Sequence, residues 1–195
     1  MSHRLVETKH ALQLSGCLLV ASTTHPAPQL AQSIFLVTWH RNEGSIGVLL
    51  NRSLVTDARS LLSQVVGGSA KQMAHSTVQY GGPLAGPIIA LHARPDLADA
   101  EVAAGVYIAA QQAYLKHLAS LQREECRWVV GHTAWRSGEL EQQIESGWWY
   151  PIPATPDLVF SEVDEAWQRA IRRVGDLSLA LWTGCPLIPN SAIWN

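Results

Sequence analysis

Two histidines and two glutamates could together bind a metal ion or transfer a proton. They are His40, Glu43, His132 and Glu141. Neutral imidazoles and carboxylates are metal ligands, and a histidine beside a carboxylate can shuttle protons. The four residues come from two distant segments, without the tight spacing of an H-E-x-x-H helix, so the site forms only if two loops meet. A metal-assisted hydrolase is therefore the alternative function. Because a hairpin cap and a solvated helix face explain the same residues, we assign no metal, cofactor or catalytic residue.

A glycine-rich segment offers a second kind of site. Gly81 and Gly82 begin the run Gly-Gly-Pro-Leu-Ala-Gly, whose backbone amides could hold a phosphate. The run is neither a P-loop nor a G-x-G-x-x-G motif, and no helix clearly starts after it. A tight turn between two strands is the favoured interpretation. The chain also has no G-x-S-x-G element that would indicate a serine nucleophile.

Three tryptophans could form an aromatic binding surface. We predict that Trp135 and Trp148 fill the groove between a helix and the sheet. Trp149 has the opposite strand parity, so the alternation of side chains predicts that it faces outward. An exposed tryptophan there would be a plausible anchor for a partner protein.

The segment 129–153 connects these residues. A buried strand at 128–130 is predicted to turn at 131–136 and to enter a helix with Ser137 as its N-cap. Leu140 and Ile144 then form an inward stripe, and Gly147 can end the helix in the left-handed conformation. An extended aromatic run follows at 148–150.

The rest of the chain mixes strands and helices without a regular βαβ alternation. Short apolar or β-rich runs predict strands at 16–21, 33–39, 46–50, 77–80, 87–92, 106–108 and 126–131. Apolar residues at helical spacing predict helices at 53–66, 110–122 and 161–174, with Gly175 ending the last one. We predict a single α+β domain over 14–175, with a bent, mostly antiparallel, partly barrel-like mixed sheet flanked by helices. Residues 1–13 form an arm, and the apolar tail 176–195 packs on the domain or on a partner.

Composition narrows the class of protein. The 195 residues carry a net charge of −2, which disfavours direct DNA binding because nucleic-acid-binding domains usually have a basic excess. The three cysteines are far apart and form no C-x-x-C pair, so neither a zinc site nor a disulfide framework is indicated. No run is long and apolar enough to span a membrane, and no signal peptide is evident. These features predict a cytoplasmic protein.

Several spaced blocks resemble the YqgE/AlgH family of bacterial proteins. They include the strand at 16–21, the block Gly44-Ser-Ile-Gly-Val-Leu-Leu-Asn-Arg52, Gly81-Gly82-Pro83, and the pattern of Gly131, Ala134, Trp135, Gly138, Leu140, Glu141, Ile144, Gly147 and Trp148. The resemblance covers about 14–175. The chain departs from the family pattern at Gln32, Ser53 and Glu139, where the family has Arg, Pro and Gln.

The resemblance implies a compact α+β fold but little about mechanism. The family is largely uncharacterised, and its label as a transcriptional regulator comes from a genetic link to alginate production. No helix-turn-helix with a basic recognition helix is evident in this chain, so an indirect regulatory role fits better than direct transcriptional regulation.

We therefore predict a non-enzymatic module that binds an unidentified protein or small molecule. Polar and glycine residues of the blocks gather in loops at strand ends, where binding sites tend to lie. The candidate residues for binding a ligand or partner are His40, Asn42, Asn51, Gly81, Gly82, His132, Trp135, Glu141 and Trp149.

Overall fold

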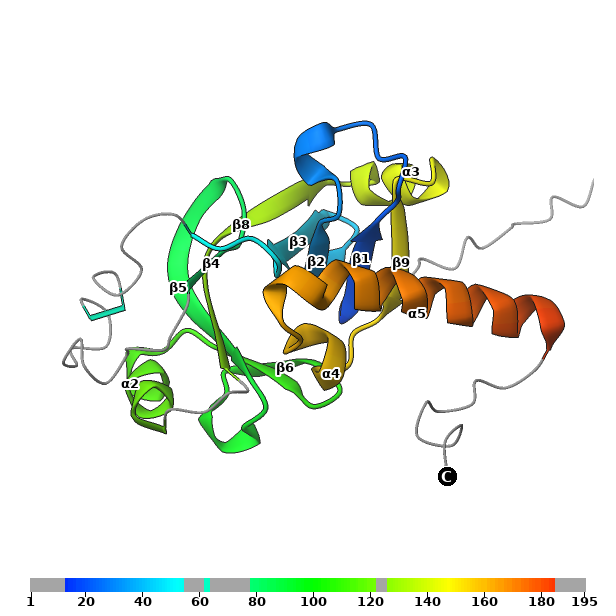
Figure 1. Ribbon diagram of the computed structural model, residues 1–195. Helices are drawn as coiled ribbons and strands as arrows, with labels where there is room; N and C mark the ends of the chain where they lie inside the picture. The colour runs from blue at the N-terminus through cyan, green and yellow to red at the C-terminus, as the bar shows by residue number, and fades with distance from the viewer. Residues whose placement is uncertain (1–12, 55–61, 64–77, 122–125, 185–195) are drawn as a thin grey trace, which may run out of the picture.

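The computed structural model describes residues 13–54, 62–63, 78–121 and 126–184, and these form a curled sheet flanked by helices (Figure 1). The strands are β1 (Cys17–Ala21), β2 (Ile34–Arg41), β3 (Gly44–Leu49), β4 (Val78–Tyr80), β5 (Leu84–His92), β6 (Ala100–Ala103), β7 (Val106–Ala109), β8 (Cys126–Arg136) and β9 (Trp149–Pro153). The helices are α2 (Gln112–Leu121), α3 (Glu139–Glu145), α4 (Pro156–Val159) and α5 (Val163–Thr183), with short 3-10 turns η1 (Pro28–Leu30) and η2 (Pro95–Leu97). The predicted α+β class is confirmed.

The sheet has nine strands in the order β6-β7-β5-β8-β3-β2-β1-β9, and β4 pairs with β8 beside this path. Every pairing along the path is antiparallel, and only the pairing of β4 with β8 is parallel. β8 is the strand that joins the two halves, because it pairs with β3, β4 and β5. The predicted mixed, mostly antiparallel sheet is thus confirmed.

Alternating apolar residues divide the core between the two faces of the sheet. On β1, Leu18 and Val20 belong to the cluster beneath α4 and α5, which includes Ala166 and Ala170. Leu19 lies on the opposite face, in the cluster that contains Leu140 of α3. A third cluster packs α2 against β4, β5 and β8. The strands of the central sheet are therefore buried on both sides, which explains their nearly continuous apolar runs.

β8 is longer than predicted. We expected a turn at 131–136, but the strand continues to Arg136, and Gly131 sits inside it with a φ of 77°. The strand continues past this residue because β3 pairs with 133–136 on one side. Ser137 is not the N-cap of α3; that position is Gly138, and it makes no side-chain capping hydrogen bond.

The last helix is also longer than predicted. Gly175 does not end α5, which runs on to Thr183 and ends at Gly184 in the left-handed conformation. The part of the predicted tail at 176–183 is therefore helical. Most of the helix predicted at 53–66 lies outside the described residues, of which Leu62 and Ser63 are helical. Residues 1–12 of the predicted arm and 185–195 of the tail also lie outside them.

Candidate functional site

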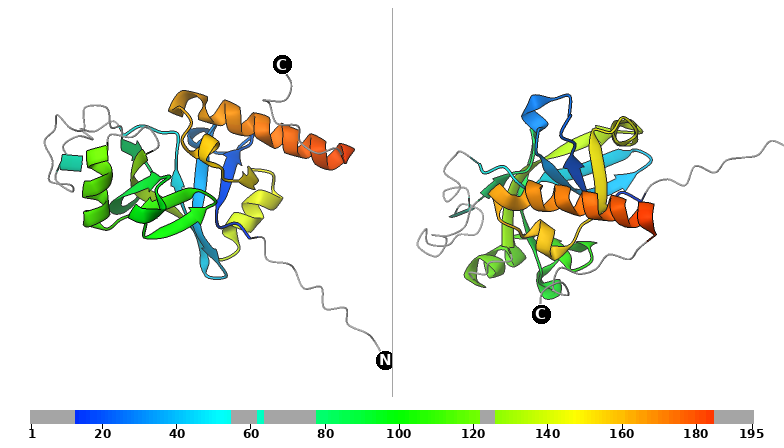
Figure 2. Two further views of the ribbon diagram at one scale, coloured as in Figure 1. Left: turned by 90° about the horizontal axis from the view of Figure 1, so that it is seen from below. Right: turned by 45° about the vertical axis from the view of Figure 1, so that its right-hand side comes forward.

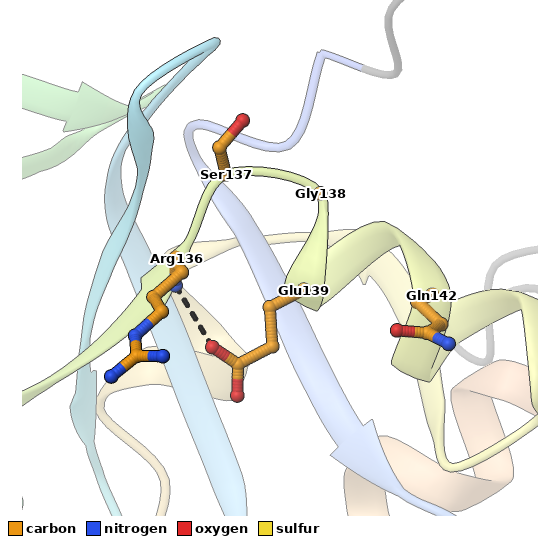
Figure 3. A pocket seen from close by; sticks show the side chains of 5 residues that line it. All are labelled: Arg136, Ser137, Gly138, Glu139 and Gln142. Carbon is orange, nitrogen blue, oxygen red and sulfur yellow. Dashed lines mark hydrogen bonds between the residues drawn. The ribbon is translucent and has the colours of Figure 1, made fainter.

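A polar pocket lies where β8 passes into α3 (Figure 3). It is lined by Arg136, Ser137, Gly138, Glu139 and Gln142. Gly138 takes a φ of 76°, a conformation that glycine adopts without steric cost, and this lets the strand turn sharply into the helix. The backbone N–H of Arg136 donates to Glu139 Oε2 at 2.9 Å, which fixes the carboxylate at the pocket wall. A guanidinium, a carboxylate, a hydroxyl and an amide thus surround the junction of β8 and α3.

Gln143 connects this pocket wall to the aromatic core. Its Oε1 accepts the indole N–H of Trp135 at 3.2 Å and that of Trp149 at 2.8 Å. Its Nε2 donates to Glu139 Oε1 at 3.4 Å. One amide side chain therefore ties both tryptophans and the Glu139 carboxylate together, which restrains the pocket wall before any ligand arrives.

Both tryptophans contact the ring of one phenylalanine. The Phe35 ring meets Trp135 and Trp149 edge to face, with centroids 5.5 Å apart in both cases. His25 lies against Trp149 at 4.6 Å, and its Nδ1 accepts the N–H of Ala27. Burial lowers the pKa of His25 below its ordinary value, so the ring is neutral at pH 7. The cluster is a rigid, uncharged support behind the pocket.

The predicted orientations of Trp148 and Trp149 are wrong. Trp149 is 1% exposed and Trp148 is 36% exposed, the reverse of the expectation, whereas Trp135 is buried as predicted. Strand β9 begins at Trp149, which pairs with Ala21, and Trp148 belongs to the preceding turn. Trp149 cannot serve as an exposed anchor for a partner.

The structure brings together His40 and Glu141. His40 Nε2 lies 3.8 Å from Glu141 Oε1, and its Nδ1 lies 2.8 Å from Ser45 Oγ. Ser45 pairs with Trp135 across β3 and β8, so His40, Trp135 and Glu141 share the end of the sheet that carries the pocket. Asn42 is exposed in the hairpin turn between β2 and β3.

The proposed four-residue metal site is not assembled. Within the described part of the chain, which includes His40, Glu43, His132 and Glu141, no three His, Cys, Asp or Glu residues are placed to hold a metal ion. His132 pairs instead with Leu84 of β5. Of the four residues, only His40 and Glu141 bring an imidazole nitrogen within 4 Å of a carboxylate oxygen.

The remaining candidate residues hold separate segments of backbone. Asn51 Oδ1 accepts the N–H of Ile34 at 3.0 Å, and its Nδ2 donates to the carbonyl of Gln32 at 2.7 Å. The N–H of Gly81 donates to Val130 at 2.7 Å. A side chain at Gly81 or Gly82 would meet the backbone of β8. Gly81 and Gly82 therefore lie against β8, whereas Asn51 joins the end of β3 to the start of β2.

Some residues of the site were not predicted. Gln143, Phe35 and His25 form the support, and Arg136 and Ser137 line the pocket. Gln143 had one signal in the sequence, because a polar residue one position before Ile144 and three after Leu140 adjoins the inward stripe of α3. The contacts of His25 join distant segments and have no local signal.

We expect the substitution Gln143→Leu to lower the free energy of unfolding by about 2 kcal/mol. It leaves two part-buried indole N–H groups without an acceptor, each costing about 1 kcal/mol at the low end of the usual range. Urea unfolding followed by circular dichroism measures the change. Gln142→Leu is the matched control, since Gln142 is exposed. Equal losses for both variants would contradict the bridging role.

Comparison with known proteins places this chain in a family. A family model described as AlgH-like matches residues 18–178. A UPF0301 protein of Chlorobium chlorochromatii is 32% identical over 168 residues, covering 83% of this chain and 86% of that protein. A UPF0301 protein of Chlamydia caviae is 24% identical and covers 98% of this chain and 100% of its own.

Two solved structures share the fold. The solution structure of AlgH from Pseudomonas aeruginosa superposes with a TM-score of 0.70 at 21% identity, covering 94% of this chain and 97% of that one. The crystal structure of DIP2367 from Corynebacterium diphtheriae gives 0.66 at 23% identity, covering 82% and 86%. The chain is thus an α+β protein with a curled half-barrel sheet. It belongs to the AlgH-like family, as its sequence blocks predicted.

Proposed function

We propose that this chain is a non-enzymatic binding module that acts indirectly in regulation, and that the pocket between β8 and α3 receives its ligand. The observation that carries the proposal is the pocket itself, in which Arg136, Ser137, Glu139 and Gln142 present complementary polar groups. A ligand or peptide with both an anionic group and a hydrogen-bond donor fits this lining, since the guanidinium binds carboxylate or phosphate and the carboxylate oxygens accept.

Rigidity behind the pocket supports a binding role. The Glu139 side chain is held by the backbone of Arg136 and by Gln143, and Gln143 is held by two tryptophans. A binding site whose wall is fixed in advance loses less conformational entropy when the ligand binds. His40 and Glu141 lie beside the same end of the sheet and extend the polar surface.

Neither alternative function has a comparable observation in its favour. The residues named for a metal-assisted hydrolase do not converge, as described above. For direct transcriptional regulation, the net charge of −2 gives no general attraction to phosphates. None of the helices within the described residues is long and apolar enough to cross a membrane.

The substitution Arg136→Ala tests the proposal. We expect it to reduce recovery of the co-purifying ligand or partner at least about tenfold, because a charge-assisted contact is worth about 1.5–3 kcal/mol. Tagged full-length protein is captured from source-cell lysate, and bound proteins and small molecules are identified by mass spectrometry.

Arg172→Ala is the matched control, since Arg172 is an exposed arginine on α5 away from the pocket. Both variants should have the melting temperature of the wild type. A bound molecule that is lost with neither variant, or equally with both, contradicts a ligand site at Arg136. Turnover of a bound small molecule by the purified protein would contradict the non-enzymatic role.

A further inference from the structure

The C-terminal end of α5 is an apolar surface without a partner in the described chain. α5 runs beyond the edge of the sheet, as Figures 1 and 2 show, so its last turns project away from the body. Leu181 and Trp182 are each 86% exposed, and Leu179 is 58% exposed. Large apolar side chains that are this exposed mark an interaction surface when they occur together.

The side chains of these three residues point to different sides of α5. At 100° per residue, Leu181 continues the stripe by which Trp167, Val174 and Leu177 pack on the core, while Leu179 lies on the far side and Trp182 between them. No charged residue occurs from Leu177 to Thr183. A helix segment that is apolar on all sides belongs in an apolar environment, not in water. We call 179–182 the helix tip.

A second exposed apolar surface crosses the sheet. Trp39 pairs with Ile46, Ile46 with Ala134, and His132 with Leu84. Directly paired residues share a face, as do residues two apart, so these five side chains form one strip over β2, β3, β8 and β5. Ile46 and Leu84 are exposed. We call this set the sheet strip.

The sheet strip continues a face that is buried elsewhere. Ile46 and Val48 are two residues apart on β3, so their side chains lie on the same face of the sheet. Val48 belongs to the core cluster that α5 covers through Ala166 and Ala170. Helix α5 therefore covers the inner part of this face, and the strip is the part that stays open. The natural cover for such a face is the apolar side of another helix.

We infer that the helix tip of one copy of this chain docks on the sheet strip of a second copy, and reciprocally, in a two-fold dimer. The two surfaces are complementary, because both are mainly apolar, and the nearest charged residues on the face of the strip, Arg41 and Arg136, lie one row further along the strands, beside Gly44. A stable interface buries about 1,200–2,000 Å² in total, whereas one large aromatic side chain supplies about 150–250 Å². One tip is too small, but two reciprocal contacts approach that size and close the assembly.

Sedimentation velocity of the full chain over a range of concentrations tests the dimer. The wild type should sediment as a dimer that dissociates on dilution. The tip variant Leu181→Asp and the strip variant Ile46→Asp should each be monomeric at concentrations where the wild type is dimeric. Gln168→Asp, at an exposed position on α5 away from the tip, should leave the dimer intact.

Several outcomes overturn the inference. A wild type that is monomeric at every concentration refutes the dimer, and so does a tip variant that still dimerises. Loss of the dimer with Leu181→Asp but not with Ile46→Asp means that the tip meets another surface. A monomer that sediments with vesicles of phosphatidylglycerol and phosphatidylethanolamine, and loses this with Leu181→Asp, means that the tip meets lipid instead. Circular dichroism of each variant ensures that a lost contact is not a lost fold.

Discussion

Replacing Trp149 with alanine is expected to lower the free energy of unfolding by about 3–5 kcal/mol, the usual cost of removing a buried aromatic side chain. Trp149 is 1% exposed, and its ring meets Phe35 edge to face. Its indole N–H donates to Gln143 at 2.8 Å. The substitution therefore leaves a cavity beneath α3 and removes one of the two donors that hold Gln143. Urea unfolding followed by tryptophan fluorescence and circular dichroism measures the loss.

Trp148→Ala is the matched control, because it removes the same side chain from the adjacent position. Trp148 is partly exposed and belongs to the turn before β9, so we expect a loss of about 1 kcal/mol or less. Similar losses for the two variants, or a larger one for Trp148→Ala, would contradict the burial described for this pair. The two variants together therefore distinguish a buried Trp149, as in the structure, from a buried Trp148, as the sequence predicted.

That error shows what alternation alone can predict. The residue types at 148–150 correctly indicated one buried and one exposed tryptophan, although the extended run begins only at Trp149. Which of the two is buried depends on the residue at which pairing with β1 starts, and that start is set by Trp149 opposite Ala21. A shift of one residue in the pairing moves every side chain of the strand to the other face of the sheet. The local sequence therefore predicts that side chains alternate, but not which of them face the core.

Long-range pairing also explains the two elements that are longer than predicted. Glycine at 131 indicated a turn, yet β8 continues because β3 and β5 supply partners on both sides. Gly175 indicated a helix end, yet the apolar stripe through Val174 and Leu177 keeps α5 on the core. A glycine inside a helix costs only about 1 kcal/mol, which such packing exceeds.

In the candidate site, too, local sequence predicted some residues, whereas the contacts between distant segments depend on the fold. Trp135 and Glu141 were predicted from one local segment, and both lie at the end of the sheet that carries the pocket. The pairing of His40 with Glu141 joins residues about a hundred positions apart, so the sequence could only suggest it as a meeting of loops. His132 was grouped with them by residue type, but the sheet register pairs it with Leu84 instead.

Replacing Gly81 with alanine is expected to lower the free energy of unfolding by more than about 3 kcal/mol, in the upper range for a single substitution. A Cβ atom at this position would overlap the carbonyl oxygen of Gly131 and come within 2.6 Å of Val129 Cγ1. The backbone of Gly81 cannot retreat, because its N–H donates to Val130 and its carbonyl accepts from Leu49. The substitution must therefore separate β8 from its neighbours, and thermal unfolding by calorimetry measures the cost.

Gly175→Ala makes the same chemical change where the structure leaves space for it. Apart from its chain neighbours and the backbone of its own helix, no atom lies within 4 Å of the added Cβ, and Gly175 is inside α5, where alanine is favoured over glycine. We expect this variant to be more stable than the wild type by about 0.5–1 kcal/mol. The stability changes of Gly81→Ala and Gly175→Ala have opposite signs because of packing alone, since alanine reduces the conformational freedom of the unfolded chain at both positions. If Gly81→Ala were as stable as the wild type, the close approach of Gly81 and Gly82 to β8 would not be needed for the stability of this half of the sheet. A loop that is free to hold a phosphate would then be the better interpretation of Gly81–Gly86.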